Sequence, residues 1–460
     1  MFLGIIDVFD PNLIKKFRFT SYEFDEKNFV AKLNYAFDDS YFFTEEITFN
    51  KSNQDENTIF TEEKRKAIDL CLKNLHLVAG SSYYKAAIPN EIVIENQKIT
   101  KETAVFMEKL YINGLGEFAH RNNLDLKEKI KFPFSDNEKP SPSEIKLSNK
   151  TVVPVGGGKD SIVTIETLKQ NNENIILFSV GNPKAIKQTV EISGLEHILV
   201  TRKLSPVLFE LNAQGAYNGH VPISGIIAFI LATASVIYDF DSVAMSNERS
   251  ASIGNLIKDG LEINHQYSKG LEFERDVSSF FNSHIMKNFN YFSFLRPLSE
   301  LGIGSIFSKF EKYHNIFTSC NSAFKIQEDK RVDRWCLNCD KCRFVFLALA
   351  PFLSKEKMLT IFGKNLLDDQ TQLIGFEELI GVSGHKPFEC VGEVEECITA
   401  FLLLNKKDEW KNDIVIKMFN EKALPNIKNE EEIINKTFSL STDHRLNDKY
   451  MRILNAYSRS

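Results

Sequence analysis

The sequence predicts an α/β protein in which a parallel-sheet, nucleotide-binding domain follows an α+β domain and precedes a mostly helical region. Short segments between residues 17 and 49 alternate apolar and polar side chains, which is typical of strands with one buried face. Apolar strands and helical segments then alternate between residues 151 and 246, and helical patterns dominate beyond Leu367. A chain of 460 residues also exceeds the usual size of one core, so several domains are expected.

The N-terminal part, 1–145, is predicted to combine an antiparallel sheet with helices. Its strand-like segments read FRFTSYEF, FVAKLNYAF and YFFTEEITF. Segments 61–80 and 101–122 repeat apolar side chains at spacings of three and four, so each is predicted to be a helix. Residues 132–150, rich in Pro, Ser, Asp and Asn, have the composition of an exposed connection, and we place a domain boundary there.

The central part, 146–366, is predicted to hold a parallel sheet. The strand-like segments TVVPV, NIILFSV, HILVT and DSVAMS alternate with helices predicted over 160–169, 185–193 and 222–238. This alternation predicts a parallel sheet that is covered on both faces by helices. The remaining residues, 367–460, are predicted to form a mostly helical domain.

Composition and charge favour a small-molecule enzyme. The net charge of −6 lacks the basicity that binding to a nucleic-acid backbone requires, so no nucleic-acid partner is expected. The N-terminus has no basic segment before its apolar stretch, and the apolar run 223–237 is shorter than the roughly 20 residues of a membrane span. We therefore expect a cytoplasmic protein without membrane insertion, and the sequence indicates no obligatory protein partner.

The segment VVPVGGGKDS has the composition of a phosphate-binding loop. A strand turns into a helix through three glycines, whose backbone amides can approach an anion without a Cβ in the way. These glycines are Gly156, Gly157 and Gly158. Lys159 can neutralise phosphate oxygens, Asp160 can hold a Mg²⁺ ion that bridges phosphates, and Ser161 offers a hydroxyl and a helix cap. These residue types suit ATP.

The spacing of this loop differs from that of the Walker A motif and of the dinucleotide-binding GxGxxG motif. The loop resembles the signature of the N-type ATP pyrophosphatases, or PP-loop enzymes, whose nucleotide domain is HUP-like. This resemblance implies that the loop holds the β and γ phosphates as a leaving pyrophosphate while an oxyanion attacks the α phosphate. The alternative is a glycine turn that only packs the strand on the helix.

Three of the seven cysteines form a C-x2-C-x2-C cluster in the segment CLNCDKC. Cys336, Cys339 and Cys342, with Cys320 upstream, provide the four thiolates of a tetrahedral structural Zn²⁺ site. Such a closed shell leaves no open position for catalysis. Free or redox-active cysteines and an iron–sulfur cluster are the alternatives.

Five further stretches carry a closer resemblance: NGHVPIS at 218–224, SNERSASIGN at 246–255, NHQYSKGLEFE at 264–274, LRPLSEL at 295–301 and GHKPFECVGEVEE at 384–396. Together with the loop and the cysteine cluster, they resemble the bacterial UDP-N-acetyl-α-D-muramoyl-L-alanyl-L-glutamate epimerase family over most of the chain. Gly156 stands where N-type pyrophosphatases often carry Ser, a departure that the epimerase-like sequences share.

The resemblance implies an enzyme of peptidoglycan precursor synthesis. Its substrate would be UDP-MurNAc-L-Ala-L-Glu, whose terminal L-Glu is inverted with ATP and Mg²⁺ and with release of AMP and diphosphate. A free carboxylate activates its α proton poorly, because deprotonation builds a second negative charge beside the first. Conversion to an acyl-adenylate removes that charge and provides an enolate. Hydrolysis of the adenylate makes the cycle effectively irreversible.

Inversion needs one group that removes the α proton and another that returns it on the opposite face, each with a pKa near neutrality. Cys390 precedes a helix predicted to begin near Glu393, and the helix N-terminus and Lys386 would lower its pKa. Glu389 and Glu393 oppose that effect. His220, in a loop of Gly, Asn and Pro, is the other candidate. A buried, small hydrophobic role is the alternative for Cys390.

Further polar residues are candidates for ligand binding. Glu248 and Arg249 follow the last predicted strand and are assigned to the nucleotide site, because the guanidinium fork of Arg249 suits a carboxylate or phosphate. His265 and its polar neighbours offer groups for a UDP-sugar and a glutamyl carboxylate. A structural hydrogen bond is the alternative role for each of them.

Two other functions fit parts of the sequence. Enzymes of the 7-cyano-7-deazaguanine synthase type, which modify nucleobases or tRNA, also carry a PP-loop and a four-cysteine zinc knuckle, but they lack the long N-terminal domain and the GHKPFECVGE tail. A sensor that binds ATP without turnover would keep Lys159 and Asp160 for binding alone. Release of pyrophosphate, and its dependence on an acceptor, separates these possibilities.

Overall fold

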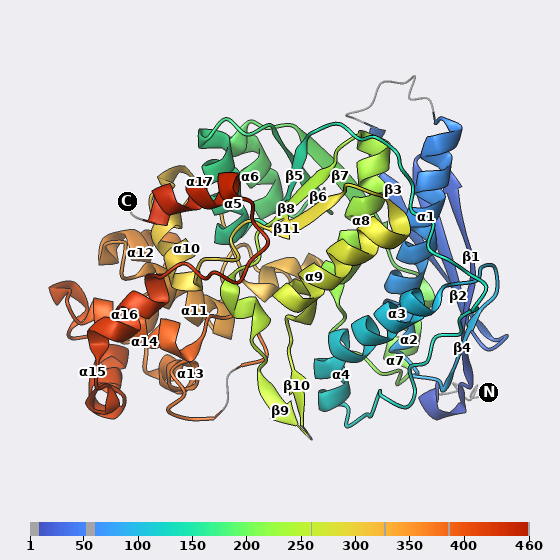
Figure 1. Ribbon diagram of the computed structural model, residues 1–460. Coiled ribbons are helices and arrows are strands. Elements are labelled where there is room, and N and C mark those ends of the chain that lie inside the picture. Colours follow the sequence, from blue (N-terminus) through green and yellow to red (C-terminus); the bar gives the residue numbers. More distant parts are fainter. Residues whose placement is uncertain (1–8, 52–59, 259, 326–327, 385–386, 459–460) are drawn as a thin grey trace. The chain divides into compact units, whose positions relative to one another are not determined.

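The computed structural model describes residues 9–51, 60–258, 260–325, 328–384 and 387–458 (Figure 1). The chain forms two compact units. The first comprises 1–150, 198–242 and 263–290, and the second comprises 151–197, 243–262 and 291–460. Two later segments thus lie with the N-terminal part, and the C-terminal helices lie with the phosphate loop. The expected boundaries of independently folding domains near 145 and 366 stay a prediction.

The first unit contains the predicted antiparallel sheet. Strands β1 (Lys16–Asp25), β2 (Val30–Phe37) and β3 (Tyr41–Phe49) pair antiparallel in sequence order. Strand β4 (Glu91–Ile94) adds to the free side of β1 in parallel. The alternation of apolar and polar residues therefore predicted these three antiparallel strands correctly.

Strand β7 (His197–Lys203) pairs antiparallel with β3, which the sequence analysis did not anticipate for the segment HILVT. A buried ion pair fixes this pairing. The guanidinium of Arg202 donates hydrogen bonds of 2.7 and 3.0 Å to the two carboxylate oxygens of Glu45 on β3. A buried carboxylate and guanidinium are stable only as partners, so this register satisfies both.

Helix α1 (Glu62–Ala79) matches the predicted helix 61–80, and the Thr61 side chain caps its N-terminus. It packs against α8 (Ile223–Tyr238) and β1. Further helices of this unit are α2 (Ser81–Tyr84), α3 (Lys101–Gly114), α4 (Gly116–Arg121), α7 (Pro206–Ala213) and α9 (Leu271–Phe280).

The helix predicted over 101–122 is broken into α3 and α4 at Leu115, whose backbone dihedrals are φ −99 and ψ 11. Gly114 and Gly116 flank the break, and glycine lowers helix stability. A Cβ on Gly114 would lie 2.7 Å from Pro222, so the close packing of this segment also requires glycine. The break makes Glu117 the second residue of α4.

The second unit contains the predicted parallel strands. Strands β5 (Thr151–Pro154) and β6 (Ile175–Val180) are parallel neighbours, and β8 (Ser242–Met245) and β11 (Asn290–Ser293) follow on the other side of β5. Helix α5 (Lys159–Gln170) follows β5, and α6 (Lys184–Ser193) follows β6. A two-stranded hairpin consists of β9 (Leu256–Lys258) and β10 (Leu261–Ile263). The α/β class is therefore confirmed.

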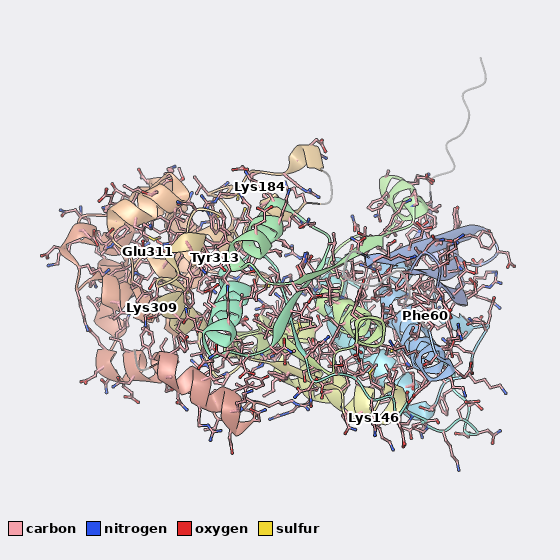
Figure 2. The ribbon with its side chains drawn as sticks, turned by 90° about the horizontal axis from the view of Figure 1, so that it is seen from above. Phe60, Lys146, Lys184, Lys309, Glu311 and Tyr313 are labelled. Atoms are coloured by element: carbon pink, nitrogen blue, oxygen red, sulfur yellow. The ribbon has the colours of Figure 1, made fainter. Side chains whose placement is uncertain are left out.

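The region beyond Leu367 is mostly helical, as predicted (Figure 1). The helices after β11 are α10 (Glu300–Phe307), α11 (Asp340–Leu349), α12 (Lys355–Phe362), α13 (Leu373–Leu379), α14 (Val394–Leu404), α15 (Ile414–Lys422), α16 (Glu430–Phe438) and α17 (Asp448–Ser458). They share one apolar core with β5 and α5. Tyr313, labelled in Figure 2, lies between α10 and α11, and its hydroxyl donates a 2.6 Å hydrogen bond to Glu166 of α5. Across the described residues, no helix is long and apolar enough to cross a membrane.

Candidate active site

The predicted phosphate loop lies between β5 and α5 in the second unit. Gly157 adopts φ +75, and a Cβ there would lie 2.9 Å from the Cβ of Ala185, so this position requires glycine. A Cβ on Gly158 would lie 2.9 Å from the Ser319 hydroxyl. Gly156 is exposed, and a Cβ on it would meet nothing within 4 Å. The open side of the loop is therefore at Gly156, beside the helix N-terminus, where first-turn amides lack intrahelical acceptors.

Lys159 is buried and forms ion pairs with Asp160 and Glu300. Burial opposes the charge on Lys159, but the two carboxylates raise the pKa of its ammonium. Burial also raises the pKa of Glu300 well above its usual range, while Lys159 opposes that shift. The lysine therefore stays charged and is held within the loop by carboxylates.

The sequence analysis missed Glu300. It is the first residue of α10, after the N-cap Ser299, and so occupies the usual place for an acidic residue in a first helical turn. It belongs to the stretch LRPLSEL, but nothing in a single sequence indicates that a residue so far along the chain would pair with Lys159.

Glu248 adds a third carboxylate to this site. It is buried and follows β8, and its charge is close enough to raise the pKa of Glu300. Its backbone carbonyl accepts a 2.6 Å hydrogen bond from the buried Arg296. One ammonium and three carboxylates thus meet here, which leaves the site with excess negative charge whenever the carboxyls are ionised.

The expected helix cap at Ser161 is wrong. Helix α5 begins at Lys159 with Gly158 as its N-cap residue, so Ser161 is the third residue of the helix. Its hydroxyl instead donates to the Gly158 carbonyl at 3.1 Å and accepts from the Gly156 amide at 3.4 Å. The Ser161 hydroxyl therefore links Gly156 to Gly158 within the loop.

A short segment connects the loop to the cysteine cluster. The Thr318 amide donates a 3.0 Å hydrogen bond to the Gly157 carbonyl, and Ser319 lies against Gly158. The next residue is Cys320, whose amide bonds the Thr318 hydroxyl at 3.1 Å. Residues 318–320 therefore connect the phosphate loop to Cys320 of the cysteine cluster.

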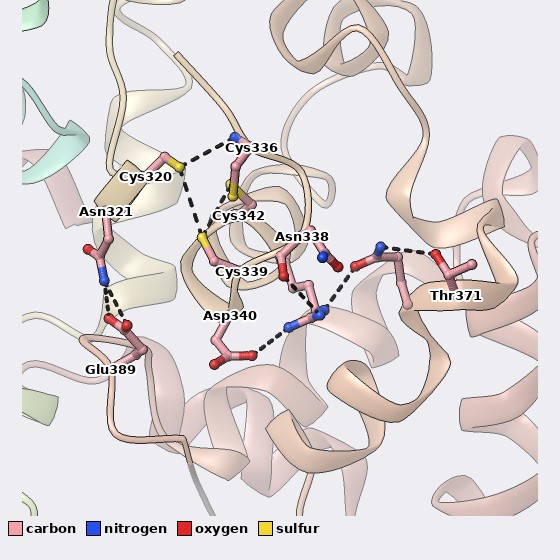
Figure 3. A network of polar contacts seen from close by, with 11 residues as sticks. Cys320, Asn321, Cys336, Asn338, Cys339, Asp340, Cys342, Thr371 and Glu389 are labelled. Atoms are coloured by element: carbon pink, nitrogen blue, oxygen red, sulfur yellow. Dashed lines mark hydrogen bonds and ion pairs between the residues drawn. The ribbon is translucent and has the colours of Figure 1, made fainter. Parts of the chain in front are cut away.

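The four cysteines of the cluster converge as predicted (Figure 3). The Sγ atoms of Cys320 and Cys339 lie 4.0 Å apart, those of Cys336 and Cys342 3.8 Å, and those of Cys339 and Cys342 3.5 Å. Four thiolates at 2.3 Å from one tetrahedral ion would lie roughly 3.8 Å from one another. The four cysteine ligands of an iron–sulfur cluster are shared among two or more irons, so they do not all lie close to one another, whereas all four Sγ atoms here lie within 4.8 Å of one another. The residues present therefore fit a single metal ion.

Cys390 lies half-buried in the loop before α14, whose N-cap residue is Glu393. Lys386, which was expected to lower the pKa of Cys390, lies outside the described residues. The adjacent Glu389 accepts hydrogen bonds of 2.6 and 2.7 Å from Asn321, the residue after Cys320 (Figure 3). This contact fixes the Cys390 loop beside the cysteine cluster.

A buried glutamate connects α14 to the start of α10. Glu396 accepts the Glu300 amide and the Glu393 amide, each at 3.0 Å, and completes a capping box. Burial raises the pKa of Glu396 to about 7. The sequence analysis did not single out this residue, although the spacing from Glu393 to Glu396 fits a capping box.

The predicted nucleotide ligand Arg249 has structural partners. Its guanidinium donates to the carbonyls of Ser439 at 3.1 Å and Thr437 at 3.4 Å, near the end of α16. Carbonyls at a helix C-terminus favour cationic partners. Its binding to a carboxylate or phosphate stays a prediction.

The first unit holds a second group of titratable residues. His220 precedes α8, His265 precedes the short helix Tyr267–Lys269, and Glu117 lies at the start of α4. One potential ligand or proton-transfer atom from each lies within 4.8 Å of the others. Glu117 is buried and both histidines are partly buried. The sequence analysis did not single out Glu117, which falls within the helix predicted over 101–122.

Comparisons with known proteins identify the family. The sequence profile described as "MurL N-terminal domain" matches residues 8–294, and that described as "MurL C-terminal domain" matches residues 316–434. The chain belongs to the MurL family. The resemblance inferred from its motifs is thereby confirmed.

Three curated relatives carry the name UDP-N-acetyl-alpha-D-muramoyl-L-alanyl-L-glutamate epimerase. The relative from Xanthomonas oryzae pv. oryzae is 40% identical over 96% of this chain and 97% of its own length. That from Micromonospora sp. is 39% identical over 95% and 97%. That from Salinispora tropica is 41% identical over 87% of both chains. No solved structure matches the chain.

Proposed function

We propose that this chain inverts the terminal L-Glu of UDP-MurNAc-L-Ala-L-Glu to D-Glu in the cytoplasmic synthesis of peptidoglycan precursors. The observation that carries this proposal is the roughly 40% identity to epimerases of that name along nearly the whole chain, as in the Xanthomonas relative at 40% over 96%. Similarity of this extent includes the loop, the cysteine cluster and the segments with His220 and Cys390.

The proposed reaction begins with activation of the substrate carboxylate by ATP. The carboxylate oxygen attacks the α phosphorus, the bond to the β phosphate breaks, and diphosphate leaves. In the acyl-adenylate the α-carbon loses its proton, and the electron pair of the C–H bond passes into the carbonyl as an enolate. Protonation on the other face and hydrolysis then give D-Glu and AMP. The glycine turn, the first turn of α5 and the charged Lys159 support a PP-loop that holds the departing diphosphate.

The charge of the loop supports a requirement for Mg²⁺. The ammonium of Lys159 is already paired with Asp160 and Glu300, so it alone offers little positive charge to a triphosphate. Oxygen ligands are those that Mg²⁺ prefers, and Asp160 is the proposed ligand, because its side chain is 30% exposed whereas that of Glu300 is 5% exposed. When bound, Mg²⁺ supplies positive charge to the phosphates of ATP.

His220 and Cys390 are the proposed proton-transfer groups. Burial, followed by the effect of His265, lowers the pKa of His220 to about 4, so its imidazole is neutral at pH 7 and is a weaker base than an ordinary histidine. Cys390, beside the N-terminus of α14, is the proposed group for the opposite face.

The cysteine cluster is proposed to hold a structural Zn²⁺ ion. The distances of 3.5–4.0 Å between sulfur atoms support a single tetrahedral ion, and four thiolates close its coordination shell. The ion would hold residues 318–320 against the phosphate loop.

The experiment that tests this function measures pyrophosphate release from ATP and Mg²⁺. UDP-MurNAc-L-Ala-L-Glu is compared with UDP-MurNAc-L-Ala and with deazaguanine-type bases, and the recovered glutamate is analysed on a chiral column. We expect release that depends on the dipeptide, together with D-Glu. Release without inversion would leave ATP cleavage standing with another acceptor. No release with any acceptor would favour an ATP sensor.

A further inference from the structure

Lys85 is a buried cation that has no carboxylate partner among the residues that the structure describes. It follows α2, is 5% exposed, and donates a 3.0 Å hydrogen bond from its ammonium to the side-chain oxygen of Asn218. Burial lowers the pKa of Lys85 to about 8, because desolvation disfavours the charged form. Lys159 and Arg202, whose side chains are 2% and 9% exposed, pair with carboxylates. A buried ammonium is costly unless it is paired, so an anion bound at Lys85 would stabilise the protein.

The loop that contacts this ammonium is fixed by backbone hydrogen bonds and faces solvent. The side-chain oxygen of Asn218 also accepts the Gly219 amide at 2.9 Å, and the Tyr217 amide donates 3.0 Å to the carbonyl of Ala86. Asn218 and Gly219 are exposed, so a ligand can reach this end of the Lys85 side chain. A lysine ammonium carries three donors, and its described contacts use one. The ammonium can therefore donate further hydrogen bonds to a ligand.

The residues that follow this loop lie close to further positive charge. Burial is the main cause of the lowered pKa of His220, and the charges of Lys269 and Arg121 lower it further, so both cations lie near this histidine. Glu117 opposes them, but its carboxylate is already hydrogen bonded to Arg121, at 2.6 Å, and to His265. These charges favour the approach of an anion over that of a cation.

We propose that Lys85, held in place by Asn218, binds an anionic oxygen of the substrate, from either a carboxylate or a phosphate group. The identity of the ligand rests on the proposed function, because UDP-MurNAc-L-Ala-L-Glu carries both groups. Both residues belong to the first unit, and the site requires no residue of the second. In the alternative role, the lysine stem only fills apolar space while its ammonium reaches toward water. Removal of the charge would then leave ligand binding unchanged.

The test measures the Kd of UDP-MurNAc-L-Ala-L-Glu by titration calorimetry without ATP. Lys85→Met removes the charge, Lys85→Arg keeps it, and Lys66→Met, at a side chain of α1 that is 73% exposed, is the control for loss of an ammonium in the same unit. We expect the Kd to rise about 10- to 100-fold in Lys85→Met, since a hydrogen bond to a charged group contributes factors of that size. The rise should be smaller in Lys85→Arg and absent in Lys66→Met. A Kd within about twofold of wild type in folded Lys85→Met overturns the proposal.

Two fragments of the substrate identify the anion. UDP-GlcNAc carries the diphosphate without a carboxylate, and L-Ala-L-Glu carries carboxylates without a phosphate. Weaker binding of UDP-GlcNAc to Lys85→Met than to the wild type assigns a phosphate to the site, and weaker binding of L-Ala-L-Glu assigns a carboxylate. If neither the fragments nor the whole substrate lose affinity, the proposal is overturned.

A measurement on the wild-type protein keeps the test decisive if Lys85→Met fails to fold. NMR of ¹³C-labelled lysine, assigned with Lys85→Arg, gives the pKa of Lys85 with and without bound UDP-MurNAc-L-Ala-L-Glu. An anion favours the charged form, so this pKa should rise from about 8 toward the usual lysine value of about 10.4. An unchanged pKa at saturation overturns the proposal. If the wild type forms no D-Glu, the proposed function fails, and the same titration with the two fragments still decides the anion site.

Discussion

Lys159 is the buried cation of the predicted phosphate loop. It is only 2% exposed and is the ammonium that faces Asp160 and Glu300. The sequence predicted its place in the loop and its charge. It did not predict its acidic partners, because Glu300 approaches through folding rather than through proximity in the chain. A motif in a single sequence indicates the ligand class, but not the groups that hold a motif residue in place.

Replacing Lys159 should destabilise the folded protein, because the buried Glu300 would lose its ion-pair partner. In Lys159→Met, Glu300 keeps a raised pKa without its ammonium, and the free energy of unfolding should fall by about 3 kcal/mol at pH 7. The folded variant binds more protons than the unfolded chain, so its stability falls further as the pH rises above the normal range of a glutamate. Urea unfolding at pH 5 and pH 7 checks this. The double variant Lys159→Met/Glu300→Gln should recover most of the loss, and no recovery would contradict the pairing.

Two neighbouring glycines provide a matched pair for the loop. Gly157→Ala forces a positive φ on alanine and places its Cβ 2.9 Å from Ala185, so the free energy of unfolding should fall by about 2 kcal/mol. Gly156→Ala meets nothing within 4 Å and should change it by less than about 0.5 kcal/mol. Thermal unfolding of both variants checks the difference. Equal effects would mean that the loop is not shaped as described.

Among the elements, the segment 318–320 connects the cysteine cluster to the phosphate loop. Sequence spacing predicted the four cysteines because ligand number and spacing are local properties of a metal site. It did not predict the hydrogen bond from Thr318 to Gly157, which depends on tertiary packing. The break between α3 and α4 was missed for a similar reason, since the glycines there serve contact with Pro222.

Loss of one cluster cysteine should impair ATP cleavage although no cysteine lies in the phosphate loop. We expect Cys336→Ser to lose the bound metal and to lower the rate of pyrophosphate release at least tenfold, because residues 318–320 lose their anchor. Metal content and pyrophosphate release are measured on the same sample. Cys71→Ser, at a buried thiol in the other unit that donates to the Ala232 carbonyl, is the control and should keep the metal. A metal-free Cys336→Ser with full activity would refute the link.

Helix α1 and strand β2 are joined by a histidine that should make the protein sensitive to acid. His76 Nε2 contacts the Asn34 carbonyl at 2.8 Å, and burial lowers the pKa of His76 to about 4. The unfolded chain binds the proton more readily, so this stabilisation is present above about pH 6.5 and is lost as the pH falls toward 4. The drop in unfolding free energy between pH 7 and pH 5 should be about 2 kcal/mol smaller in His76→Gln. Identical pH profiles of the two proteins would contradict this.

For the whole molecule, the α/β class, the antiparallel N-terminal strands and the helical C-terminal region follow from hydrophobic periodicity. The grouping of the chain into two units does not follow from this periodicity, because residues 198–242 and 263–290 join the N-terminal part through contacts between distant segments. Glu117 and His265 come together in this way, far apart in the sequence and within one unit. Short-range patterns identify elements and motifs, whereas the contact partners of a side chain are set by topology.

The central claim is that ATP activates the carboxylate whose α-carbon is inverted. The most direct measurement uses substrate with ¹⁸O in the α-carboxylate of its terminal glutamate, followed by mass spectrometry of the AMP. If the carboxylate oxygen attacks the α phosphorus and water later attacks the acyl carbon, one ¹⁸O atom appears in each AMP that accompanies D-Glu. Formation of D-Glu with unlabelled AMP would contradict the account.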